Sequence, residues 1–140
     1  MKNSRTNLFL ATLIHNINEM EKSGTSQAIP ITVVVAGQII TGEAVSESEY
    51  FSHDFTSPWK ELFDAVISNP RSEHLNVPED EFDLEKIPDE LKQGFLFLRN
   101  AFYINGDKTI PSIGNEGIPI QVRLADIVAF NFGNISFNQN

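Results

Sequence analysis

Residues 31–45 read ITVVVAGQIITGEAV, and this stretch decides the fold. β-Branched residues alternate along both of its halves, which is typical of strands with one buried face. Gly37–Gln38 supplies a tight turn between the halves, and Gly42 predicts a bulge or a strong bend in the second half. Residues 29–46 are therefore predicted to form a β-hairpin.

Before the hairpin, apolar residues recur at steps of three and four, which predicts a helix over residues 5–22. Asn3 and Ser4 are plausible N-caps, and Gly24 lies where a left-handed cap residue is common. The apolar run 8–14 is not followed by the small-residue cleavage site of a signal peptide. We therefore interpret this run as part of a helix of the folded protein and not as a signal peptide that is cleaved off.

After the hairpin, two helix-start signals predict a helical insertion over residues 47–68. Ser46 and Glu49 form a Ser-x-x-Glu capping box, and Pro58 occupies the first position of a second helix. Asn69–Pro70 is expected to end it. Between these signals runs an amphipathic stripe of Trp59, Leu62, Phe63, Val66 and Ile67.

Residues 70–93 are acidic, and their three prolines interrupt any long helix. Between Ser72 and Gln93 eight carboxylates accompany two lysines, a net of −6 out of the formal charge of −9 for the whole chain. We expect an ordered or half-ordered loop here, with one helical turn near residues 89–93.

The last third of the chain predicts three further strands, at 95–104, 118–124 and 127–130, within residues 95–136. A polar loop over 105–117 should be exposed and mobile. The prediction is thus an α+β fold: a five-stranded antiparallel small barrel or bent sheet, with an N-terminal helix and a helical and acidic insertion (47–93) between strands 2 and 3. A closed barrel and an open sheet with helices on one face both fit the pattern.

The composition narrows the class of protein. The 140 residues suit a single domain over 1–140. There is no cysteine, which removes disulfides and thiolate chemistry and fits a cytoplasmic location. No stretch approaches the ~20 apolar residues that span a bilayer, so no membrane partner is expected. The acidic net charge disfavours a nucleic-acid partner.

Motifs for catalysis are missing from the sequence. His15, His53 and His74 lie in different segments without metal-ligand spacing, and no nucleophile elbow or phosphate loop occurs. The acidic run 79–85 lacks the ordered pattern of a calcium loop. We therefore expect a non-enzymatic protein without catalytic residues, metal or cofactor. A carboxylate site assembled in space is the enzymatic alternative.

Candidate partner-binding residues fall in the insertion. The amphipathic stripe over residues 59–67 either packs on the sheet or forms an exposed face for a partner. The acidic run is a solvated surface that could dock a basic partner. The candidates are Trp59, Phe63, Glu79, Asp80, Glu81, Asp83 and Glu85.

Two blocks of the sequence, 31–51 and 95–104 continued by 118–136, resemble the gas vesicle accessory protein U family. The most telling pieces are Gly37 with Gly42, Glu49-Tyr50-Phe51 and Gly133-Asn134-Ile135-Ser136. The resemblance implies a non-enzymatic role in gas vesicle assembly, organisation or clustering in the bacterial cytoplasm. It implies gas vesicle structural or accessory proteins as partners and supplies no catalytic residues.

The same two blocks also resemble an Sm-like barrel, with Asp126–Ile127 in the late strand pair. That resemblance implies a homo-oligomeric binding module for a peptide or nucleic-acid ligand. Sm-like rings bind RNA on basic and aromatic surfaces, whereas the strands here offer Arg99, Arg123 and little else that is basic. We take this second resemblance as an indication of fold and oligomerisation rather than of RNA binding.

Overall fold

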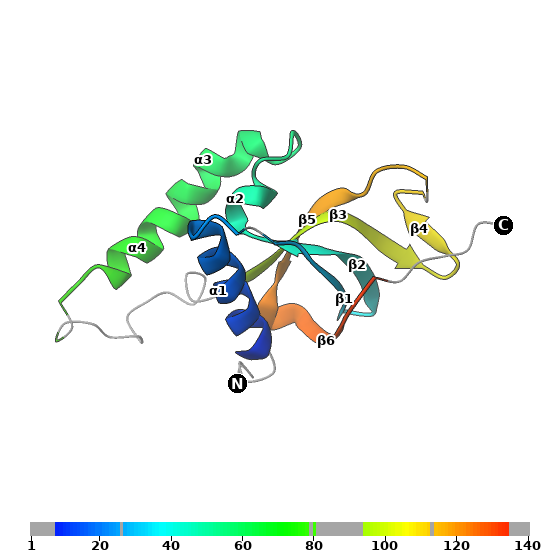
Figure 1. Cartoon of the computed structure of the whole chain (residues 1–140), viewed down its shortest axis with the longest axis horizontal. Coiled ribbons are helices and arrows are strands. Elements are labelled where there is room, and N and C mark those ends of the chain that lie inside the picture. The colour runs from blue at the N-terminus through cyan, green and yellow to red at the C-terminus, as the bar shows by residue number, and fades with distance from the viewer. Residues whose placement is uncertain (1–7, 26, 79, 81–93, 113, 135–140) are drawn as a thin grey trace.

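A computed structural model describes residues 8–25, 27–78, 80, 94–112 and 114–134. A bent antiparallel sheet forms the body of the protein, and the N-terminal helix lies beside it. A helical arm projects from the body between the second and third strands (Figure 1). The predicted α+β fold with an N-terminal helix and a helical insertion is therefore confirmed.

Six strands make up the sheet: β1 (Ile29–Val35), β2 (Gln38–Val45), β3 (Phe95–Asn105), β4 (Lys108–Ile110), β5 (Ile118–Arg123) and β6 (Ile127–Phe132). The α-helices are α1 (Leu8–Lys22), α2 (Glu47–Tyr50), α3 (Lys60–Phe63) and α4 (Asn69–Leu75). Two short 3₁₀ segments, η2 (Ser57–Trp59) and η6 (Leu124–Asp126), and one π-helical turn, η3 (Asp64–Ser68), complete the described elements.

The hairpin of β1 and β2 is confirmed, with Val35 opposite Gln38. Its turn lies at Ala36 and Gly37, one residue earlier than predicted, and both residues have positive φ, at 50° and 80°. Two consecutive positive φ values mark the turn type whose twist matches that of the flanking strands. Gln38 therefore already belongs to β2.

Gly42 marks an irregularity in β2, as predicted. The pairing of β2 with β3 shifts register between Thr41 and Glu43. A Cβ atom added at Gly42 would come within 2.7 Å of the Ala101 Cβ on β3. Glycine is therefore required here because the two strands approach too closely for any side chain.

The sheet has the strand order β4-β3-β2-β1-β6, and β5 pairs with β3 beside β4. The long strand β3 serves two partners along one edge, with Phe95–Ala101 facing β5 and Tyr103–Asn105 facing β4. Asn100, at a φ of 49°, lies where the pairing with β5 shifts register. This bend lets one strand support two short neighbours.

The predicted number of strands is wrong. The sheet has six strands rather than five, because residues 108–110 of the expected polar loop fold back on β3 after a turn at Gly106. Of the two predicted forms, the sheet takes the open one and does not close into an Sm-like barrel: in the described part of the chain, β5 pairs with β3 and β6 with β1, at opposite edges. The short η6 joins these two strands without pairing them.

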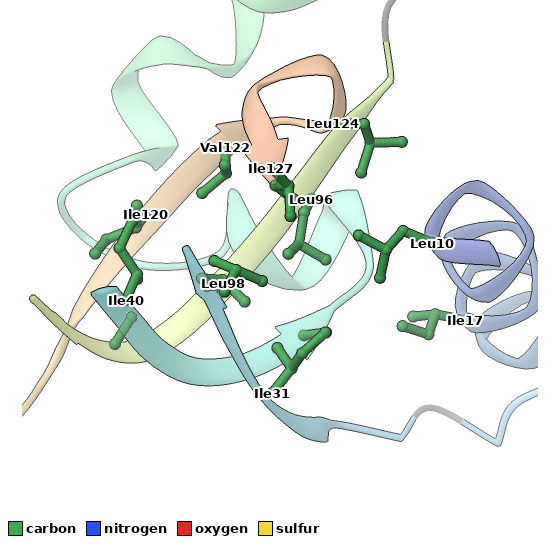
Figure 2. Packing of buried hydrophobic residues seen from close by; sticks show 13 residues of the cluster. Leu10, Ile17, Ile31, Ile40, Leu96, Leu98, Ile120, Val122, Leu124 and Ile127 are labelled. Carbon is green, nitrogen blue, oxygen red and sulfur yellow. The ribbon is translucent and has the colours of Figure 1, made fainter. Parts of the chain in front are cut away.

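Helix α1 covers the main hydrophobic core. Leu10 and Ile17 are buried and point from the helix toward apolar side chains of the sheet (Figure 2). Gly24, with a φ of 84°, ends the helix as predicted. The expected first turn and its caps, residues 3–7, lie outside the described residues. Sheet residues of the core include Ile31, Val33, Ile40, Leu96, Leu98, Ile120, Val122 and Ile127.

Pro70 does not end the helical insertion, contrary to the prediction. It lies in the first turn of α4, directly after the π-helical turn η3, where the backbone hydrogen bonds already depart from the regular α-helical pattern. The helical path therefore continues to Leu75, so part of the expected 70–93 loop is helix. The predicted turn at 89–93 lies outside the described residues.

Candidate functional site

The helical arm comprises residues 55–75, that is η2, α3, η3 and α4 with the two residues before them. It extends away from the sheet as one continuous rod (Figure 1). None of these four helical segments contains a fully buried residue. The arm is therefore held by partial contacts along one side and is open along the other.

An aromatic cluster anchors the arm to the body. The ring of Phe63 lies 5.1 Å from that of Phe51, 5.9 Å from Phe95 and 6.0 Å from Phe97, measured between centroids. Such tilted and edge-to-face pairs add stabilisation beyond the area they bury. Tyr50 packs 4.9 Å from Phe97, and burial raises the pKa of its hydroxyl.

Polar contacts fix how the chain leaves the sheet before the arm. The backbone N–H of Glu49 donates to the Ser46 hydroxyl at 3.2 Å, so Ser46 is the N-cap of α2, as predicted, while the Glu49 carboxylate accepts a hydrogen bond from Arg99. The Thr56 hydroxyl is buried and donates to the Tyr50 carbonyl at 2.5 Å. The bonds at Ser46 and Thr56 tie the chain to α2, so the arm starts from a defined position.

Lys60 supplies the main ionic contact on the anchored side. Its Nζ donates to Asp64 at 2.6 Å, lies 3.6 Å from Glu47, and sits 5.6 Å from the centre of the Phe51 ring. The Lys60 hydrogen bond lowers the pKa of Asp64, and that same bond raises the pKa of Lys60. The Lys60 ammonium group is therefore paired with carboxylates of the protein itself.

Beside the anchor, the arm carries large apolar side chains that are exposed. Phe55, Trp59, Leu62 and Val66 are 64%, 60%, 57% and 55% exposed. Steps of three and four residues place Trp59, Leu62 and Val66 on one helical face, and Phe55 lies in the turn just before the first helical segment. We call these four residues the apolar stripe.

An open groove of about 460 Å³ runs along Trp59, Leu62 and Val66 of this stripe. Most of its lining is apolar, and one wall comes from α2 and β5. The lining residues are Tyr50, Phe51, Thr56, Trp59, Leu62, Phe63, Val66, Ile67 and Gln121. The arm and the edge of the sheet thus form a single concave surface.

The exposed charges of the arm and of the turns that flank it have one sign. Among described residues of 51–80, the exposed charged side chains are the carboxylates of Asp54, Glu61, Glu73 and Asp80. The two bases of this stretch, Lys60 and Arg71, are partly buried; burial lowers the pKa of Arg71, against the attraction of Glu47. An approaching molecule therefore meets an apolar groove on an arm whose exposed charges are acidic, and we call these carboxylates the acidic rim.

The structure brings two of the predicted binding residues together. Trp59 and Phe63 both line the groove, although Phe63 also belongs to the anchor. Asp80 is exposed beyond the end of α4. Glu79, Glu81, Asp83 and Glu85 lie outside the described residues. All seven therefore stay predictions.

Sequence reasoning missed two groups of exposed residues. Phe55 belongs to the exposed apolar stripe but was not among the predicted binding residues. Its position four residues before Trp59 was the available signal in the sequence. The second group lies where α1 meets β6: the ring of Phe9 is 5.9 Å from those of Phe130 and Phe132. That aromatic contact joins distant segments, so no local pattern pointed to it.

Within the part of the chain that the structure describes, no cluster of three or more histidine, aspartate or glutamate side chains has the geometry to hold a metal ion. His53 instead accepts a hydrogen bond at Nδ1 from the Phe55 backbone N–H, at 3.0 Å. Across the same residues, no helix is long and apolar enough to cross a membrane.

An open antiparallel sheet with an N-terminal helix and a projecting arm defines a small α+β protein. The family model described as gas vesicle protein GvpU-like matches residues 8–135. The chain belongs to this family and is thus a gas vesicle-related protein. The match includes the arm, for which the sequence blocks quoted above offered no counterpart. No curated protein and no solved structure matches the chain.

Proposed function

We propose that this protein is a non-enzymatic accessory factor that acts in gas vesicle assembly, organisation or clustering through protein–protein contacts in the cytoplasm. Membership of the GvpU-like family supplies the gas vesicle connection. The observation that carries the contact role is the apolar stripe, which an anchored arm holds away from the sheet.

The size of the stripe supports this role. A large aromatic side chain covers about 150–250 Å², so Phe55 and Trp59 alone present roughly 200–300 Å² at their exposures of 64% and 60%. Leu62 and Val66 extend this area along the same face. The largest contiguous apolar patch on a monomer is commonly about 300–600 Å² and is often a functional surface.

A flotation experiment tests the proposal. Purified gas vesicles are mixed with the protein, floated by centrifugation and assayed for bound protein in the buoyant layer. We expect the wild-type chain to float with the vesicles and Leu62→Ser to stay in solution, because serine removes apolar area at the centre of the stripe. Absence of wild-type protein from the buoyant layer would contradict the vesicle role.

Val128→Ser is the matched control variant. Val128 is 67% exposed on β6, outside the groove, so its replacement removes a comparable apolar side chain from another surface. We expect this variant to float like the wild type. Equal loss of flotation in both variants would place the contact elsewhere and contradict the assignment to the stripe.

A further inference from the structure

We infer that the groove along the arm binds an amphipathic helix whose apolar face is flanked by lysine or arginine. This inference rests on the proposed contact role and names the chemistry of the partner. Its two supports are the spacing of Trp59, Leu62 and Val66 and the single sign of the exposed charges along the arm.

The stripe has the geometry of a helix-binding face. Trp59 and Val66 are seven residues apart, which is about two turns of a helix. Anchors at steps of three and four residues match the ridges that another helix presents at the same steps. The wall formed by Tyr50 and Gln121 leaves the groove open along its length.

Charge selects the partner. Asp54, just before the arm, and Glu61 and Glu73 within it carry exposed carboxylates. Lys60 is engaged by Asp64, so it does not neutralise this rim. A helix with basic residues beside its apolar face would pair with the rim while its apolar side chains fill the groove.

The same charges disfavour a second copy of this chain as the occupant. Two arms that pack stripe to stripe would place two acidic rims together, and each chain carries a formal net charge of −9. Like charges held together across an interface cost free energy and suppress the wrong partner. A separate basic helix meets no such opposition.

The single tryptophan of the chain provides a site-specific probe, because Trp59 belongs to the stripe and lines the groove. The ligand is a synthetic helical peptide of about 18 residues, or five turns, without tryptophan. It carries leucine on one face and lysine on both flanks. We expect a blue shift of the Trp59 emission on titration and a saturable rise in the anisotropy of a labelled peptide.

Two control peptides separate the apolar and ionic contributions. One carries glutamate in place of every lysine, and the other has the lysine peptide's composition in scrambled order. We expect both to bind at least tenfold more weakly than the lysine peptide. Equal binding of the glutamate peptide would overturn the charge argument, and equal binding of the scrambled peptide would overturn the helix argument.

Variants of the protein complete the test. Glu61→Lys should weaken the lysine peptide and strengthen the glutamate peptide, whereas Leu62→Ser should weaken both and Val128→Ser neither. No emission shift with any peptide would overturn the inference. A blue shift that grows with protein concentration alone, with a dimer mass in light scattering, would show a second copy on the stripe and would also overturn it.

The outcome is separable from that of the flotation experiment. Peptide binding without flotation would leave the groove a binding site for basic helices and remove the gas vesicle role. Flotation that depends on Leu62, without peptide binding, would keep the proposed function and overturn the basic helix as the partner.

Discussion

The body of the protein and its helical arm differ in how they use apolar side chains. In the body, Leu10, Ile31, Leu96 and Leu98 are completely buried between α1 and the sheet. In the arm, no helical residue is fully buried, and the large side chains of the apolar stripe remain more than half exposed. The body therefore contributes most of the folding free energy, whereas the arm leaves much of its apolar surface exposed to solvent.

The stability of the fold therefore depends mainly on the body, and the surface available to a partner depends mainly on the arm. The arm depends on one aromatic anchor, centred on Phe63, and on the Lys60–Asp64 ion pair. Changes on its outer face should therefore leave the fold intact while they alter what the arm can bind. Changes in the core should act on the whole molecule. The predictions that follow test this separation from the largest expected effect to the smallest.

Leu98→Ala should destabilise the entire protein. Leu98 is 0% exposed in the centre of the core, and removal of a buried leucine side chain leaves a cavity. We expect the free energy of unfolding to fall by about 2–5 kcal/mol in urea denaturation. Val128→Ala, at a 67% exposed position, should change it by less than about 0.5 kcal/mol. Similar losses for both would contradict the assigned core.

Phe63→Ala should loosen the arm and spare the body. Complete burial of a phenylalanine makes its removal cost about 3–5 kcal/mol, so the half-buried Phe63 should cost about 1–3 kcal/mol. We expect hydrogen exchange to accelerate at least tenfold for amides of α3 and α4, with little change in β1 and β2. Uniform acceleration across the sheet would show that arm and body unfold together.

The Lys60–Asp64 pair should give the arm a weak dependence on acid. The pKa of Asp64 is lower in the folded protein than its ordinary value of 3.8, chiefly through the hydrogen bond from Lys60. The pair therefore stabilises the arm above pH 3.8, and this contribution disappears as pH falls through the lowered pKa. The effect is the smallest of the three because about a third of each side chain is open to solvent, which screens the pair.

Asp64→Asn provides the measurement for this pair. The variant should lose a little arm protection near neutral pH and show a flatter acid profile than the wild type, followed by hydrogen exchange of α3 amides. Identical acid profiles for the two proteins would show that the ion pair does not support the arm.

Local signals predicted most of the fold and only part of the surface. The hairpin, α1 with its Gly24 cap, the Ser46 box and β3 were readable because each depends on neighbours in the sequence. The three-residue strand β4 was missed, since it exists only by pairing with β3. Pro70 was misinterpreted as a helix end because the helical path continues through it into α4.

At the candidate site, the limit of prediction from local sequence signals is clearer still. An amphipathic stripe has the same spacing whether it packs on a sheet or faces water, so Trp59 and Phe63 could not be distinguished from sequence. In the structure Phe63 turns to the aromatic anchor and Trp59 to the open groove. A rotation of the arm about its axis would exchange these roles without any change in the pattern.

The sequence by itself determined the family, the α+β class, the acidic surface and the position of the helical insertion. These follow from local periodicity, composition and turn residues. Only the tertiary structure decided that the sheet is open and that the arm leaves its apolar stripe exposed. Both depend on contacts between segments far apart in the chain, such as β6 on β1 and Phe63 on Phe95, and those contacts leave no local pattern.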